Sequence, residues 1–187
     1  MLTERPDDPA ARDRDSMANA PEVWLRGPLA DIPALLQPVA HSLLQSREEL
    51  HATLAGLSPA DVWVTPGGAA SVGFHARHAA GSLDRLFTYA RGEQLNSAQK
   101  AALAGEGQPD VRAQVVAGLL AEFDAAVERA LAQLRTTGEA TLTEARGVDR
   151  AGLPSTVVGL LFHAAEHTQR HMGQLMTTAK MVALGGV

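Results

Sequence analysis

The sequence predicts an all-α protein built as a four-helix bundle. Its 187 residues, 45% of them hydrophobic, suffice for one globular domain with a core. Aromatic residues make up only 4%, and residues that favour helices are common, which favours helix over strand. Apolar residues recur at helical spacing in four long segments, each with one apolar stripe. A four-helix bundle is the simplest arrangement in which each stripe is covered by neighbours.

The first part of the chain is predicted to lie outside the bundle. Residues 1–30 are charged and contain prolines, so we expect a flexible N-terminal lead-in followed by the bundle over residues 31–187. The beginning lacks the apolar central region of a secretory signal. No window approaches the roughly 20 consecutive apolar residues of a membrane span. We therefore expect a cytoplasmic protein with no membrane partner.

The first two long helices have clear start and stop signals. The first is predicted from Pro33 or Pro38 to Leu54, because a proline suits the first turn of a helix. Ser71 can cap the second, which we expect to end at Gly92. One side of this second helix is predicted to carry His75, His78, Ser82, Leu86 and Tyr89.

The other two helices follow a short helical bridge at residues 97–103. Pro109 is predicted to open the third helix, whose apolar stripe continues to Gly138. Residues 138–153 lack a consistent period, so we expect a loop with at most a brief extended part. The fourth helix is predicted from Pro154 or Ser155 to about Leu184.

Composition excludes several kinds of function. The chain has no cysteine, so any metal must be held by nitrogen or oxygen ligands. It has 16 Lys and Arg against 21 Asp and Glu, a formal charge of -5, and no dense basic stripe. Nucleic-acid binding is therefore not expected, because it depends on neutralising phosphates.

The stretch "HAAEHTQRH" places His163, His167 and His171 four residues apart, and therefore on one side of the fourth helix. Three imidazoles beside a packed face cannot readily satisfy each other's hydrogen bonds, whereas a metal ion can use their lone pairs. The first and third lie about 12 Å apart along a helix, so only one adjacent pair can share an ion. Spacing alone leaves both pairs open.

A third ligand can come from the second helix, from either His75 or His78. Three imidazoles would leave a fourth position for water or substrate. Two other interpretations are core histidines that are satisfied by hydrogen bonds and a pH-sensitive polar patch. The zinc-protease pattern is excluded, because Ala164 and Thr168 stand where that motif needs Glu after the first His of a pair.

The segments "HTQRHMGQL" and "SVGFHARHAAGSLDRLFTYARGEQL" resemble the last and second helices of DinB/YfiT-like proteins. The resemblance covers about residues 30–184 and implies a DinB-like four-helix bundle. It also implies that His78, His167 and His171 bind a divalent metal ion, nickel or zinc, with His163 as a neighbour. The chain differs from the usual signature at Arg170 and Met172, and neither change removes a ligand.

This resemblance implies a metal-dependent enzyme, thiol S-transferase-like or hydrolase-like, with a small molecule or low-molecular-weight thiol as substrate. The alternative is a non-catalytic, metal-stabilised stress-response or dimerisation module. Relatives also suggest a homodimer. Around the site, Gly173 is expected to allow close helix approach, Asp84 and Arg85 to form an exposed pair or loop anchor, and Trp24 and Trp63 to be packing anchors.

Overall fold

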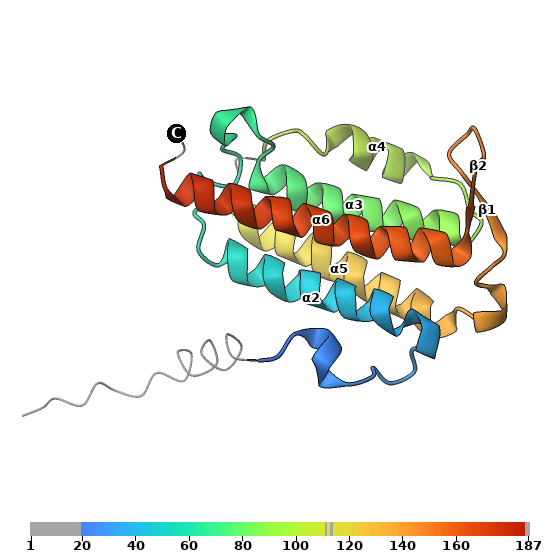
Figure 1. Ribbon diagram of the computed structural model, residues 1–187. Coiled ribbons are helices and arrows are strands. Elements are labelled where there is room, and N and C mark those ends of the chain that lie inside the picture. Colours follow the sequence, from blue (N-terminus) through green and yellow to red (C-terminus); the bar gives the residue numbers. More distant parts are fainter. Residues whose placement is uncertain (1–19, 111, 113, 186–187) are drawn as a thin grey trace, which may run out of the picture.

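The computed structural model describes residues 20–110, 112 and 114–185. Within them, four long helices form a bundle, which confirms the predicted all-α fold (Figure 1). Helix α3 packs against α5 and α6, and α2 packs against the same two helices on their other sides. The bundle helices are α2 (Gln37–Leu54), α3 (Val72–Ala90), α5 (Val115–Thr136) and α6 (Val157–Ala183).

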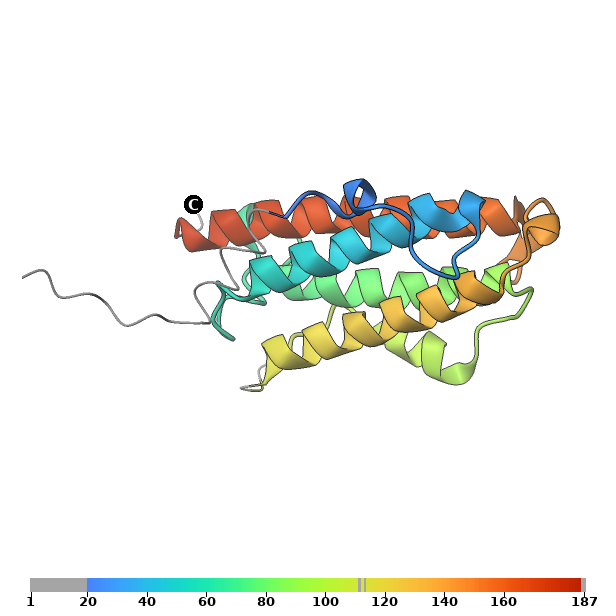
Figure 2. The same cartoon turned by 90° about the horizontal axis from the view of Figure 1, so that it is seen from below.

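Shorter elements surround the bundle. Helices α3 and α5 run in the same direction, so their connection returns along the bundle and carries α4 on the outside of α3 (Figure 1). The N-terminal segment lies on the α2 and α6 side, away from α4 (Figure 2). These elements are the 3₁₀ helices η1 (Val23–Arg26), η2 (Ala34–Leu36), η3 (Pro66–Gly68) and η4 (Glu139–Thr141), the helix α4 (Ser97–Gly105), and the strands β1 (Ala145–Val148) and β2 (Leu153–Thr156).

Local hydrogen bonds define where the helices near the histidines begin. The Ser71 hydroxyl accepts a hydrogen bond from the Phe74 amide, as predicted for the cap of α3. Thr156 caps α6 in the same way. Helix α6 begins slightly later than predicted, because Pro154 and Ser155 belong to strand β2, which pairs antiparallel with β1.

The predicted start of the third long helix is wrong. Helix α5 begins at Val115, whereas the sequence placed its first turn at Pro109. The Asp110 carboxylate accepts hydrogen bonds from the backbone and guanidinium of Arg112, at 3.1 Å and 2.5 Å. Such local bonds between side chain and backbone compete with helix formation.

Helices α3 and α6 make the most extensive contact in the bundle, and both bury small residues. Buried alanines occur on each helix, and Leu83, Leu161 and Thr168 are buried as well. Short side chains allow two helix axes to approach closely, so polar side chains at the edge of the interface can meet. The alanines are Ala76, Ala79 and Ala80 on α3 and Ala164 and Ala165 on α6.

The predicted lead-in, residues 1–30, falls mostly on residues 1–19, outside the described part. The remainder, residues 20–30, contacts α2. There, Arg26 donates to both carboxylate oxygens of Glu48, at 2.6 Å and 2.8 Å, and Gln45 accepts from the Val23 amide. Among the described residues, no helix combines the length and apolar character needed to cross a bilayer.

Candidate metal centre

Four histidines from two antiparallel helices meet at the edge of the α3–α6 interface. His78 Nε2 of α3 lies 3.0 Å from His167 Nε2 of α6. His75 Nδ1 of α3 lies 3.0 Å from His171 Nδ1 of α6. The ring centroid of His171 is 4.5 Å from that of His78 and 4.6 Å from that of His167.

The three histidines singled out by the sequence resemblance are brought together. His78, His167 and His171 each offer a ring nitrogen, and these nitrogens lie within 4.8 Å of one another. All three side chains are partly exposed. His75 is buried and contacts His171, but it lies outside this set. His163 contacts the ring of His167 from one turn away, with centroids 5.4 Å apart, and its Nδ1 lies 3.1 Å from Glu166.

Helix geometry and an aromatic side chain position these rings. His167 and His171 share a face of α6 because they are one turn apart. His78 stands in the second turn of α3, after the Ser71 cap. The ring of Phe74, one turn before it, stacks on the His78 imidazole with 5.4 Å between centroids and 15° between planes. Phe74 therefore covers one face of that imidazole.

The environment favours neutral imidazoles. Burial, reinforced by the neighbouring His78 and His167, lowers the pKa of His171 to about 4. Burial and the nearby His78 also lower the pKa values of His75 and His167 below their usual range. At neutral pH each of these three rings is therefore uncharged and has one nitrogen with a free lone pair.

The spacing of the donor nitrogens suits a cation. On His167 it is Nε2 that faces His78, whereas Nδ1 is buried and has no hydrogen-bond partner among the described residues. The facing Nε2 atoms of His78 and His167 are 3.0 Å apart, close to the roughly 3.3 Å between two nitrogens on one tetrahedral zinc ion with bonds of about 2.0 Å. Three imidazoles are also a donor set that suits zinc or nickel. The residues therefore fit a divalent metal ion.

A buried carboxylate that sequence reasoning missed contacts the cluster. Glu106, which directly follows α4, is only 4% exposed. Its Oε2 lies 2.7 Å from His78 Nδ1, and its Oε1 accepts from Arg85 at 2.5 Å. Burial alone would raise the pKa of Glu106. The hydrogen bonds from His78 and Arg85 lower this pKa by more than burial raises it, so the net shift is downward and the carboxylate is ionised at neutral pH.

Two expectations about the surroundings are wrong. The exposed pair expected for Asp84 and Arg85 is wrong, because Arg85 is buried; it donates to Glu106 in the turn after α4, as the alternative of a loop anchor requires. Arg85 stands seven residues after His78, and this spacing places both on the same face of the helix, which could have indicated that Arg85 lies on the side of the cluster. Gly173 does not mark a close helix approach, since a Cβ placed there would meet nothing within 4 Å among the described atoms.

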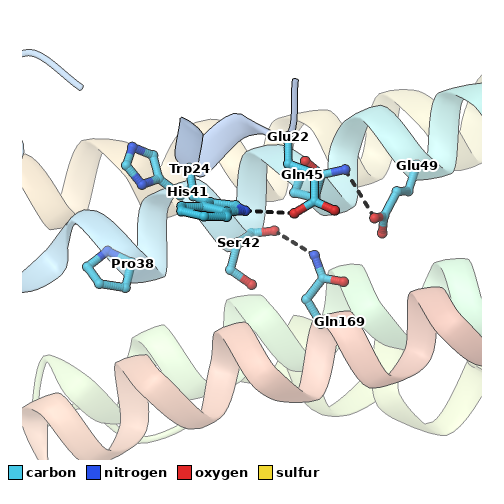
Figure 3. A pocket seen from close by; sticks show the side chains of 8 residues that line it. All are labelled: Glu22, Trp24, Pro38, His41, Ser42, Gln45, Glu49 and Gln169. Atoms are coloured by element: carbon cyan, nitrogen blue, oxygen red, sulfur yellow. Dashed lines mark hydrogen bonds between the residues drawn. The ribbon is translucent and has the colours of Figure 1, made fainter. Parts of the chain in front are cut away.

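A separate concavity lies between the N-terminal segment, α2 and α6 (Figure 3). It has a volume of about 380 Å³ and contains none of the clustered histidines. Trp24 borders it and is 61% exposed, so the expectation of a packing anchor is wrong for this tryptophan. The residues that line it are Glu22, Trp24, Pro38, His41, Ser42, Gln45, Glu49 and Gln169.

Comparisons with known proteins agree with this architecture. The crystal structure of a conserved protein from Enterococcus faecalis superposes with a TM-score of 0.60 at 19% sequence identity, covering 80% of this chain and 97% of that one. At this identity the likeness shows the fold alone. A search of curated proteins gave no significant match. The sequence model of the DinB superfamily matches residues 42–175, well over half of the chain. The chain therefore belongs to the DinB superfamily.

Proposed function

We propose that the protein is a divalent-metal-dependent enzyme, thiol S-transferase-like or hydrolase-like, in which His78, His167 and His171 hold nickel or zinc. The observation that carries the proposal is the convergence of three ring nitrogens within 4.8 Å from two helices. Low pKa values keep His167 and His171 neutral, so their lone pairs are available at neutral pH without loss of a proton.

The composition of the cluster favours an enzyme over a purely structural site. Structural zinc sites are usually closed by four protein ligands, whereas catalytic sites use three and leave one position open. Within the described part of the chain, the set of donors that lie within 4.8 Å of one another consists of three histidines, and His75, which contacts His171 alone among them, stands outside it. A bound divalent ion would withdraw charge from a thiol or water at its open position and lower the pKa of that group.

The surrounding residues constrain the substrate and the proton acceptor. Because the chain contains no cysteine, a thiol at this site has to belong to the substrate. Glu166 accepts from Arg170 at 2.6 Å through both oxygens and contacts His163. Slight burial raises the pKa of Glu166, but its bonds to Arg170 and His163 lower it below the usual range, which makes this carboxylate a weak base.

Metal analysis of protein purified without an affinity tag tests the metal site. After reconstitution with nickel or zinc and removal of free metal, we expect about one ion per chain for the wild type and for His41→Ala, and a large loss for His167→Ala. His41 is a matched control because its imidazole contacts the Gly27 carbonyl, away from the cluster. Wild-type protein with less than about 0.1 ion per chain would contradict the proposal.

A substrate screen separates the enzyme from the non-catalytic module. Loaded wild-type protein is assayed with pairs of small thiols and electrophiles and with ester and amide substrates. Turnover above that of His167→Ala supports the enzyme. Full metal loading without turnover on any substrate favours the metal-stabilised module, in which the ion joins α3 to α6. The homodimer stays a prediction, which light scattering after gel filtration checks.

A further inference from the structure

We propose that Glu106 is a positioning residue of the metal centre: it keeps the His78 proton on Nδ1, leaves Nε2 as the donor nitrogen, and thereby couples metal binding to the docking of α4. The part of this inference that concerns metal affinity rests on the proposed function. The part that concerns the proton on His78 does not require metal.

The hydrogen bonds of Glu106 determine which nitrogen of His78 carries the proton. Arg85 donates to Oε1 of Glu106, and Oε2 of the same carboxylate lies 2.7 Å from His78 Nδ1, so Oε2 is placed to accept and Nδ1 to donate. In the form of His78 that carries one N–H, Nε2 then keeps its lone pair directed at His167. Residues that orient metal-binding histidines in this way are common beside metal sites.

The surroundings of Glu106 balance the charge of its carboxylate and leave space for it. Arg85 donates to the other oxygen of Glu106 and balances its charge in a buried setting. Gly81 lies beside the pair. A Cβ at position 81 would overlap Glu106 Oε1 and stand 2.8 Å from the Arg85 guanidinium. The absence of a side chain at Gly81 therefore leaves the space that the carboxylate occupies.

Helix α4 is held to α3 mainly by polar side chains. None of the residues of α4 is buried. Gln99 donates to Asp84 at 2.6 Å and to Thr88 at 2.8 Å. Arg77 donates to the carbonyl of Gly105 at the end of α4. The bond from His78 to Glu106 is thus a substantial part of the docking of α4, so metal binding that favours the Nδ1–H form of His78 also favours the docked helix.

The substitution Glu106→Gln tests this role because it keeps the shape and inverts the hydrogen bonding. Arg85 has only donors, so it requires the amide oxygen, and the amide NH₂ then faces His78 Nδ1. That nitrogen must accept, which moves the proton to Nε2 and blocks the donor nitrogen. We expect about 10- to 100-fold weaker metal binding, a loss at least as large as that of Glu106→Ala.

Glu93→Gln is the matched control, because Glu93 is bound to Arg91 at the surface before α4. Metal affinity is measured by competition with a chromophoric chelator, using zinc alone. Hydrogen exchange of residues 97–106 is measured in the metal-free proteins. We expect exchange at least about tenfold faster in Glu106→Gln than in Glu93→Gln, because the charged hydrogen bonds that dock the segment are replaced by weaker neutral ones. Equal affinities and equal exchange would overturn the proposal.

Nitrogen-15 NMR of the imidazoles in metal-free wild-type protein at pH 7.5 decides the question without any variant. We expect Nδ1 of His78 to be protonated and Nε2 to be unprotonated. A proton on Nε2 would overturn the proposal, even if Glu106→Gln failed to fold. Wild-type protein that shows the expected form but binds no zinc would leave this role of Glu106 standing and refute the proposed function instead.

Discussion

Replacing Gly81 by alanine should destabilise the protein, although alanine is normally the better residue inside a helix. Gly81 lies in α3, where a Cβ would collide with the Glu106 carboxylate and the Arg85 guanidinium. Gly173, inside α6, is the matched control, since a Cβ there would meet nothing within 4 Å among the described atoms. The same substitution is therefore expected to have opposite effects at the two positions.

The magnitudes follow from two terms. Replacing glycine by alanine in a helix interior stabilises by about 0.5–1 kcal/mol, which is the full effect expected for Gly173→Ala. At Gly81 the same gain is opposed by loss of at least one charged hydrogen bond of Glu106, about 1.5–3 kcal/mol. The net destabilisation for Gly81→Ala is then roughly 0.5–2.5 kcal/mol.

Urea unfolding of the metal-free proteins at pH 7.5, followed by circular dichroism, measures both effects. We expect the midpoint of Gly173→Ala above that of the wild type and the midpoint of Gly81→Ala below it, with unchanged slopes. If Gly81→Ala were as stable as Gly173→Ala, the carboxylate would not need the space beside Gly81, and the reasoning would be refuted.

Two further predictions concern pH and the hairpin. Because the pKa of folded His171 is lowered to about 4 from its usual 6.5, the unfolded chain binds a proton in this window that the folded protein does not. The stability that neutral His171 contributes to the metal-free protein should be fully present above pH 6.5 and be lost as the pH falls from 6.5 to 4. The urea midpoint should therefore fall less steeply with pH in His171→Gln, and an equally steep fall in both proteins would contradict this. Tyr89 donates to Asp149 at 2.8 Å, and burial together with this bond raises the pKa of Tyr89 to about 12. Tyr89→Phe should therefore lower the free energy of unfolding by about 1.5–3 kcal/mol in urea titrations, and an unchanged value would show that the bond contributes nothing.

Most of the bundle could be predicted because its signals are local. Ser71 before an apolar stripe and Gly92 after it bracket α3, whose last residue is Ala90. Pro109 misled the prediction of α5, because its preference for the first turn is weaker than the hydrogen bonds between Asp110 and Arg112. The hairpin before α6 was expected only as a brief extended part, since its two strands have four residues each and their sequences, ARGV and LPST, do not alternate between apolar and polar residues.

The site could be predicted only in part. Spacing of four residues identified the row on α6, but the choice of His78 over His75 depended on family resemblance, because both lie near the same face of α3. The structure places His78 in the cluster and His75 beside His171. Glu106 could not be found from the sequence, because it is 28 residues from His78 and meets it only through the docking of α4.

A crystal structure of zinc-loaded protein, with anomalous diffraction recorded at the zinc edge, tests the central claim most directly. We expect one anomalous peak within bonding distance of ring nitrogens of His78, His167 and His171, with His75 and Glu106 outside the inner coordination sphere. A peak bonded instead to His75 or His163, or no peak at the α3–α6 edge, would contradict the account.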